Sequence, residues 1–215
     1  MKDYKYAALA SLVAISLTSV VPVYAQPHDT EFDLTPNPKT VACLSDSSGQ
    51  PPTAHVEVFR GELNDTLVLE IHHFKPGLAF DLFTVQRSPF LADGTPDPAF
   101  TGSFGLAWYQ TDVQVDNDSV DADGRVKIET ILLDQIFGFD PDVGLKPTNT
   151  FHVGFWFNDP NDAAPCGFDV TKPTPFNGEH KAGPFAFISL PNPDTGLGPL
   201  CTNPDTSTTP AGCNP

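Results

Sequence analysis

The sequence has little charge, very little positive charge, and few of the residues that favour helices. Charged residues are 18% of the 215 residues, and 11 Lys and Arg stand against 27 Asp and Glu, which gives a formal net charge of −16. Phosphate binding needs a surplus of Lys and Arg, so the composition argues against a nucleic-acid partner. The scarcity of Lys and Glu, together with many prolines, argues equally against a helical bundle.

Proline, glycine and phenylalanine are abundant instead. The chain has 23 Pro, 16 Gly and 17 Phe, and hydrophobic residues make up 40% of it. That apolar share is too large for a disordered chain, because disordered segments contain few hydrophobic residues. The composition therefore predicts an acidic β protein whose strands are separated by turns rich in proline and glycine.

The N-terminus has the pattern of a secretory signal peptide. Lys2 and Lys5 precede an apolar stretch over 6–21, and Val23-Tyr24-Ala25 matches the small-x-small pattern of a cleavage site. A membrane anchor is the alternative, but the apolar stretch is near the lower limit of about 17 residues for spanning a bilayer. We therefore expect residues 1–25 to be removed and the protein to be secreted, periplasmic or on the cell surface, with no membrane association after cleavage.

Export changes how the four cysteines are interpreted. No two of them have the Cys-x-x-Cys spacing of a zinc ribbon or a redox site, and an oxidising compartment favours disulfides. Three pairings are possible. The pairing that we predict joins Cys166 to Cys201 and Cys43 to Cys213, so that one bridge pins the C-terminal tail.

Through the middle of the chain, hydrophobic residues alternate with period two, as in strands with one buried face. Segments of this kind cover 56–58, 67–71, 78–86, 104–115, 125–132, 151–157 and 185–190. They predict an all-β fold, an antiparallel β-sandwich with long loops. The only helix candidate is a short segment at 133–137.

Four parts follow from these patterns. The signal peptide precedes an extended N-terminal arm over 26–53, which holds one short strand at 40–43. The β-sandwich domain covers 54–190, and an irregular tail covers 191–215. The arm and the tail are both rich in turn-forming residues, which predicts little regular structure in either.

Two hairpin patterns resemble those of known modules. The stretch Leu67–Val85 is a strand, a Pro-Gly turn and a second strand, and Gly102–Ile128 has the form G-x-F … D-x-D-G-x-V. Both are similar to hairpins of immunoglobulin-like and fibronectin-type modules in secreted bacterial proteins. The resemblance implies an immunoglobulin-like sandwich architecture and no particular activity.

Closely spaced aspartates form the first candidate site. They are Asp112, Asp116, Asp118, Asp121 and Asp123. Calcium prefers six to eight oxygen ligands, and the four aspartates from Asp116 onward can supply several from one loop, so calcium is the one cofactor that the sequence suggests. The EF-hand pattern is absent, and the alternative is a solvated hairpin loop in which Asp123-Gly124 forms the turn.

Histidines form the second candidate site. His55, His72, His73, His152 and His180 all lie in the predicted sandwich domain. Adjacent strands bring alternate residues close together, so His72 and His152 are candidate ligands for one metal ion. Hydrogen-bonded histidines of the sheet are the alternative, because no short motif fixes a ligand geometry.

Aromatic residues and loops supply candidate ligand-binding residues. Trp108, Tyr109 and Trp156 lie on predicted strands, where an exposed ring can stack on a sugar or anchor a partner; the alternative is that they belong to the core. Asp159, Glu179 and His180 lie in loops that can share one end of a sandwich.

The predicted function is that of an exported, non-catalytic binding or cell-surface module for a protein or carbohydrate ligand. No catalytic residue is assigned, because Thr101 stands where a nucleophile elbow around Ser103 needs glycine. One alternative is an extracytoplasmic metalloprotein or hydrolase that uses His72, His152 and His180. The other is a structural matrix or appendage protein whose arm or tail adds a strand to another chain.

Overall fold

The computed structural model describes residues 30–61, 64–132, 150–174 and 181–201. Several predictions fall outside them: the signal peptide and its membrane-anchor alternative, the helix candidate at 133–137, Glu179, His180 and Cys213.

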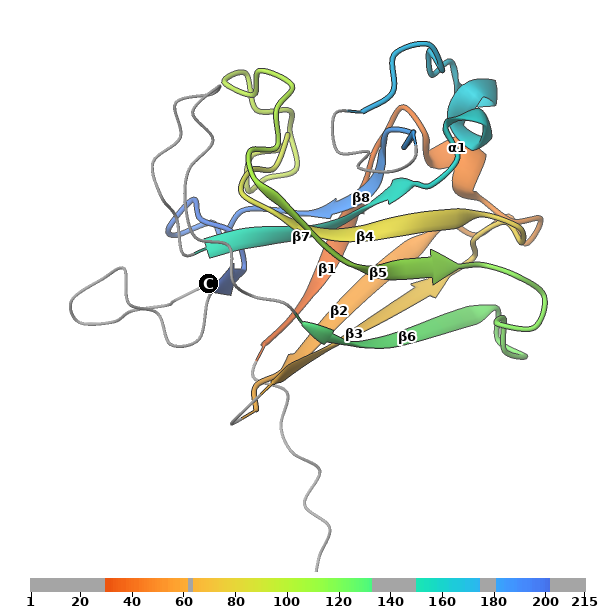
Figure 1. Cartoon of the computed structure of the whole chain (residues 1–215), viewed down its shortest axis with the longest axis horizontal. Helices are drawn as coiled ribbons and strands as arrows, with labels where there is room; N and C mark the ends of the chain where they lie inside the picture. The colour runs from red at the N-terminus through yellow and green to blue at the C-terminus, as the bar shows by residue number, and fades with distance from the viewer. Residues whose placement is uncertain (1–29, 62–63, 133–149, 175–180, 202–215) are drawn as a thin grey trace, which may run out of the picture.

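Nine strands and two short helical turns make up the described part of the chain (Figure 1). The strands are β1 (Thr30–Pro36), β2 (Thr53–Phe59), β3 (Asp65–His72), β4 (Ala79–Val85), β5 (Ala107–Gln114), β6 (Arg125–Leu132), β7 (Thr150–Phe157), β8 (Phe185–Ser189) and β9 (Leu200–Cys201). The helical turns are α1 (Val41–Leu44) and η1 (Pro160–Cys166). The prediction of an all-β fold is confirmed, and all the strand pairs are antiparallel.

The strands form one bent sheet in the order β5-β4-β7-β8-β1-β2-β3-β6, with the short β9 paired to β7. The bend lies in β1, whose residues 30–33 pair with β2 and whose residues 34–36 pair with β8. Figure 1 shows β1 running between these two neighbours. We call β2, β3, β6 and residues 30–33 of β1 the β2 half of the sheet. The β7 half consists of β4, β5, β7, β8 and residues 34–36 of β1.

The end strands β5 and β6 also contact each other, so the sheet is nearly closed and barrel-like. Two separate sheets, as the predicted sandwich requires, are not confirmed. The difference comes from β1, because this strand continues from one half into the other. The described part of the predicted N-terminal arm therefore supplies the strand that connects the two halves.

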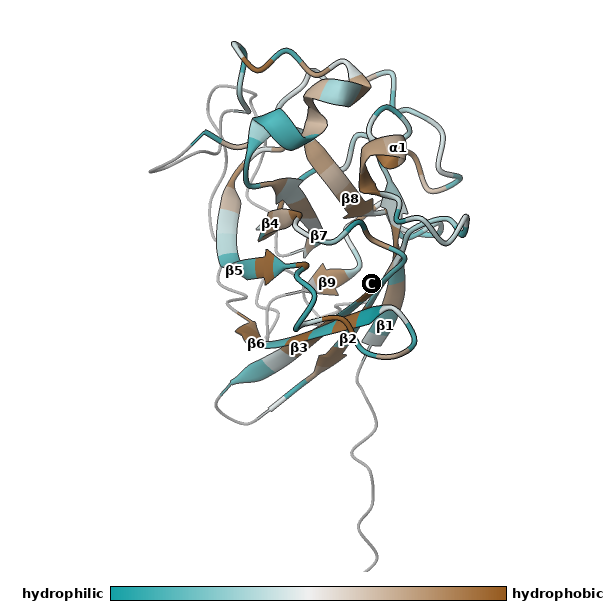
Figure 2. Ribbon diagram, turned by 90° about the vertical axis from the view of Figure 1, so that its right-hand side faces the viewer, coloured by the Kyte–Doolittle hydropathy of each residue, from teal (hydrophilic) through white to brown (hydrophobic). Residues whose placement is uncertain are grey.

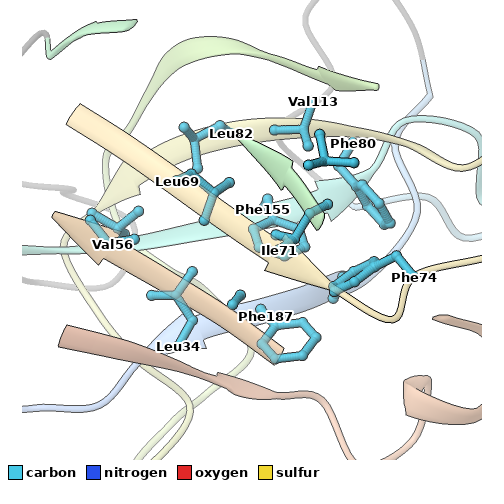
Figure 3. Close-up of a cluster of buried hydrophobic side chains, with 14 of the residues drawn as sticks. Leu34, Val56, Leu69, Ile71, Phe74, Phe80, Leu82, Val113, Phe155 and Phe187 are labelled. Carbon is cyan, nitrogen blue, oxygen red and sulfur yellow. The ribbon is translucent and has the colours of Figure 1, made fainter. Parts of the chain in front are cut away.

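The main core fills the space between the two halves (Figure 3). In β2 the buried residues Ala54, Val56 and Val58 alternate with His55 and Glu57, which lie on the outer face. This is the period-two pattern of a strand with one face in the core. In Figure 2, hydrophilic bands interrupt the hydrophobic colour of β3, whereas β8 is mostly hydrophobic.

Within the β7 half, the central strands β4 and β7 are buried on both faces. Phe155 of β7 packs in the main core, whereas its neighbour Trp156 packs in a second cluster on the opposite face. Phe90 and Phe104 belong to that second cluster, so the segment between β4 and β5 covers the outer face here. The ring of Phe104 meets the ring of Trp156 edge-on at 5.0 Å between centroids.

The disulfide joins Cys43 to Cys166, so both predicted pairings, Cys166–Cys201 and Cys43–Cys213, are wrong. The predicted strand at 40–43 is also wrong, because Val41–Leu44 forms the helical turn α1. This turn lies against η1 and brings the two Cα atoms to 6.1 Å, within the range that a disulfide needs. The bridge therefore links the two helical turns.

Candidate functional site

Tyr109 and Asp112 share the outer face of β5 because the strand contains a β-bulge. Residues three apart on a regular strand point to opposite faces. Here the register between β4 and β5 shifts after Leu82, so that Gln110 is an extra residue with no partner in the ladder. An extra residue of this kind re-aims the side chains next to it. As a result, Tyr109 lies opposite Phe83 and Asp112 lies opposite Asp81, both of which belong to the outer face.

The Tyr109 ring is half exposed and is held on two sides. Its hydroxyl donates a hydrogen bond of 2.8 Å to Oδ1 of Asp112. Its ring meets the ring of Phe83 edge-on, with centroids 5.7 Å apart. Burial, the hydrogen bond to Asp112 and the charges of Asp112 and Asp81 raise the pKa of Tyr109 to about 12, because all of them disfavour the tyrosinate anion.

Two further polar side chains, Asp81 and Asn158, extend this group from Asp112 across β4. Asp81 is buried and lies directly across from Asp112 in the ladder. Its Oδ1 accepts a hydrogen bond of 3.0 Å from Nδ2 of Asn158, which follows β7. We call Tyr109, Asp112, Asp81 and Asn158 the Tyr109 surface, in which one aromatic ring adjoins two carboxylates and an amide.

The predicted aromatic residues are separated by the structure. Trp108 is 47% exposed, but it lies opposite Thr84 and therefore on the other face from Tyr109. Trp156 has no exposed surface, so its prediction as a ligand-binding residue is wrong. The segment between β4 and β5 covers Trp156. Alternation along β7 cannot predict this, because it shows only which face a side chain is on and not what covers that face.

Asp159, another predicted ligand-binding residue, caps η1. Its side chain accepts hydrogen bonds of 2.8 Å from the backbone N–H and from Nδ2 of Asn161. A carboxylate at this position stabilises the start of a helical turn. Its role in the described structure is therefore local.

Two of the four aspartates of the predicted calcium loop, Asp116 and Asp121, accept hydrogen bonds within the loop. Oδ1 of Asp116 accepts hydrogen bonds from the backbone N–H groups of Asp118 and Ser119. Oδ1 of Asp121 accepts them from Asp123 and Arg125, and the hydrogen bond from Arg125 is the main cause that lowers the pKa of Asp121. These are the contacts of a solvated hairpin loop, and calcium binding stays a prediction.

The two histidines predicted as metal ligands do not meet. His72 ends β3 in the β2 half, whereas His152 lies in β7 in the other half. His152 is buried, with Nδ1 3.1 Å from the carbonyl oxygen of Ser189, and burial lowers its pKa to about 4. The prediction that they share a metal ion is therefore wrong, because the bend in the sheet separates their strands.

A different histidine lies among carboxylates. In the described residues, Glu31, His55 and Glu57 are the one group of three whose potential ligand atoms lie within 4.8 Å of one another. Glu31 lies opposite Glu57, and Asp33 lies opposite His55, on the outer face of β1 and β2. The sequence carries a signal for this group, since 31–33 and 55–57 both alternate polar, apolar, polar. The prediction misses it because it places 26–53 in an arm outside the sheet.

The chain matches no known protein-family model, no curated protein and no solved structure. Within the described residues, no helix has both the length and the apolar character needed to cross a membrane.

Proposed function

We propose that this chain is an exported, non-catalytic binding protein and that it binds neutral carbohydrate through the Tyr109 surface. The observation that carries the proposal is the half-exposed ring of Tyr109, fixed by Asp112 and Phe83 beside carboxylate groups. The proposal includes export through the predicted signal peptide. It also includes the resemblance to immunoglobulin-like modules, which share with this fold a core enclosed between two facing layers of strands.

The chemistry of the Tyr109 surface favours a sugar. A flat aromatic ring offers a large contact area for the C–H face of a pyranose at a small cost in conformational entropy. The neighbouring exposed carboxylate of Asp112 can accept hydrogen bonds from sugar hydroxyls, as the few polar groups of a ligand site usually do. Because Tyr109 is already held by two contacts, its side chain loses little conformational entropy when a ligand binds.

The net charge narrows the ligand class. A formal charge of −16 repels acidic polymers, so uronic-acid-rich or sulfated glycans are poor candidates. Neutral glycans carry no such penalty. We therefore expect retention on neutral polysaccharides rather than on charged ones.

The test is retention of the purified protein on insoluble cellulose, chitin and xylan, measured as depletion from solution. Tyr109→Ala should weaken the binding about fivefold, since stacking on one ring contributes on the order of 1 kcal/mol. Tyr109→Phe keeps the ring and loses the hydrogen bond to Asp112, so it should retain most of the binding.

Ile131→Ala is the matched control, because Ile131 is an apolar residue of β6 with 55% of its surface exposed. This variant should bind as the unchanged protein does. If none of the polysaccharides retains the protein, or if Tyr109→Ala and Ile131→Ala behave alike, the proposal fails.

A further inference from the structure

We propose that Glu31, His55 and Glu57 form a binding site for one divalent first-row transition-metal ion, with zinc as the probe. The site is independent of the proposed carbohydrate binding, because it lies on the outer face of the β2 half, whereas the Tyr109 surface lies on the outer face of the β7 half.

The imidazole of His55 is oriented for metal binding. Its Nδ1 lies 2.8 Å from Oδ1 of Asp33, a distance at which Nδ1–H donates a hydrogen bond to the carboxylate. A proton held on Nδ1 leaves the lone pair on Nε2, and Nε2 lies 4.0 Å from Oε2 of Glu31. This arrangement of carboxylate, histidine and open nitrogen is the one that histidine ligands of metal ions adopt in proteins.

The three ligand atoms can reach coordination distance by side-chain rotation. In a tetrahedral zinc site with bonds of about 2.0–2.1 Å, neighbouring ligand atoms lie about 3.3 Å apart. The atoms here lie within 4.8 Å of one another, and they belong to side chains at a sheet surface. The backbone is fixed by the β1–β2 ladder, in which Glu31 faces Glu57, so only side-chain torsions have to change.

The charge around His55 favours a cation. Asp33, Glu31 and Glu57 surround the imidazole, and Glu70 lies across from it on β3. Lys127 pairs with Glu70 at 3.6 Å, but the Glu57 carboxylate makes no hydrogen bond or ion pair with any other described residue. A divalent ion would neutralise this excess of negative charge.

The donor set determines the class of ion. One imidazole nitrogen and two carboxylate oxygens suit zinc and its first-row neighbours better than calcium, which prefers an all-oxygen shell. Three protein ligands leave a fourth position for water or another ligand. Glu31 and Asp33 also line a groove of about 390 Å³ between β1 and residues 189–193, which gives such a ligand room beside the site.

The test is a calorimetric titration of the purified, untagged full chain with zinc chloride. We expect one zinc ion per chain at this site. His55→Ala and Glu57→Gln should each weaken that binding at least tenfold, and Asp33→Asn, which keeps the three ligands but loses the carboxylate partner, should weaken it about 10- to 100-fold. Cobalt bound in place of zinc should give the visible absorption that is typical of a cobalt ion with few ligands. His55→Ala should abolish this absorption.

His72→Ala is the matched control, since His72 ends the neighbouring strand β3 and is also only partly buried. This variant should bind zinc as the unchanged protein does. Circular dichroism of each variant confirms that it is folded, and the isosteric Glu57→Gln provides the test if His55→Ala does not fold. Absence of zinc binding in the unchanged protein, or an unchanged affinity in both His55→Ala and Glu57→Gln, would overturn the proposal.

Discussion

Tyr109 shows how much a side chain depends on its immediate neighbours. Its ring is exposed enough to meet a ligand, but its hydroxyl is committed to Asp112 and its environment is acidic. Burial keeps the phenol protonated, and the hydrogen bond to Asp112 and the nearby carboxylate charges add to this effect on the pKa.

The ionisation of Tyr109 gives a direct measurement of this environment. In protein lacking residues 1–25 it is the only tyrosine, since the others are Tyr4, Tyr6 and Tyr24. Its ultraviolet titration should have a midpoint near pH 12, above the ordinary value of 10.0. Asp112→Asn should lower the midpoint, whereas Asp116→Asn, the same change of charge farther along the chain, should have little effect. A midpoint near 10.0 in the unchanged protein would contradict this assignment.

His152 is the second residue whose chemistry follows from burial. Burial lowers its pKa from 6.5 to about 4, although the carbonyl oxygen of Ser189 partly opposes the shift. Between these two pH values the unfolded chain binds a proton that the folded chain does not. The free energy of unfolding therefore falls as the pH is lowered through this window, and it is fully retained above it.

We expect the protonation of His152 alone to lower the free energy of unfolding by up to about 3 kcal/mol as the pH falls from 6.5 to about 4. His152→Asn keeps a donor near the position of Nδ1 but cannot be protonated, so its stability should fall less between about pH 7 and about pH 4. Urea unfolding at both pH values measures the difference. Equal losses in the two proteins would show that His152 is not the responsible group.

At the scale of elements, β7 is the strand with the most demanding packing. Both of its faces are buried, and it pairs with β4, β8 and β9. Gly154 allows this close approach. A Cβ atom there would lie 2.9 Å from the carbonyl oxygen of Phe187 and 3.0 Å from Cγ1 of Ile188.

Gly154→Ala should therefore destabilise the protein by about 1–3 kcal/mol, because the backbone of β8 would have to move away. Thr53→Ala is the control, at an exposed position of β2, and its effect should stay within about 0.5 kcal/mol. Denaturant unfolding measures both variants. An unchanged midpoint for Gly154→Ala would mean that β8 adjusts without cost.

For the molecule as a whole, the disulfide joins two parts of the chain that are far apart in sequence. Cys43 and Cys166 are 123 residues apart in sequence, so their bond restricts most of the unfolded chain. The two helical turns that it joins lie beyond the ends of the strands (Figure 1).

Replacing both Cys43 and Cys166 with serine should lower the free energy of unfolding by about 2–4 kcal/mol, since the cross-link reduces the entropy of the unfolded state. Denaturant unfolding of the oxidised protein and of the double variant gives the difference. Peptide mapping without reduction should recover the Cys43–Cys166 pair, and recovery of Cys166 joined to Cys201 would contradict the structure.

The sequence by itself determined the approximate positions of the strands from β2 to β8. Period-two alternation marks β2, which has one buried face, and short runs of strand-forming residues between turn signals mark β4 and β7, which are buried on both faces. The sequence also determined that Phe155 and Trp156 point to opposite faces, and tertiary packing decided that both are buried. Alternation is also present in β1, where Phe32 and Leu34 alternate with polar residues, but the prediction places this stretch in an arm outside the sheet. Nothing in the sequence indicates that the pairing of β1 switches between two neighbours.

Only the tertiary structure decided the closure of the sheet, the disulfide and the group around His55. Each of these depends on residues that are far apart in sequence and that meet through β1 or through the helical turns. The composition and spacing of a segment record its own preferences. They do not record which distant segment will lie beside it, because pairing is fixed by the burial of the whole core.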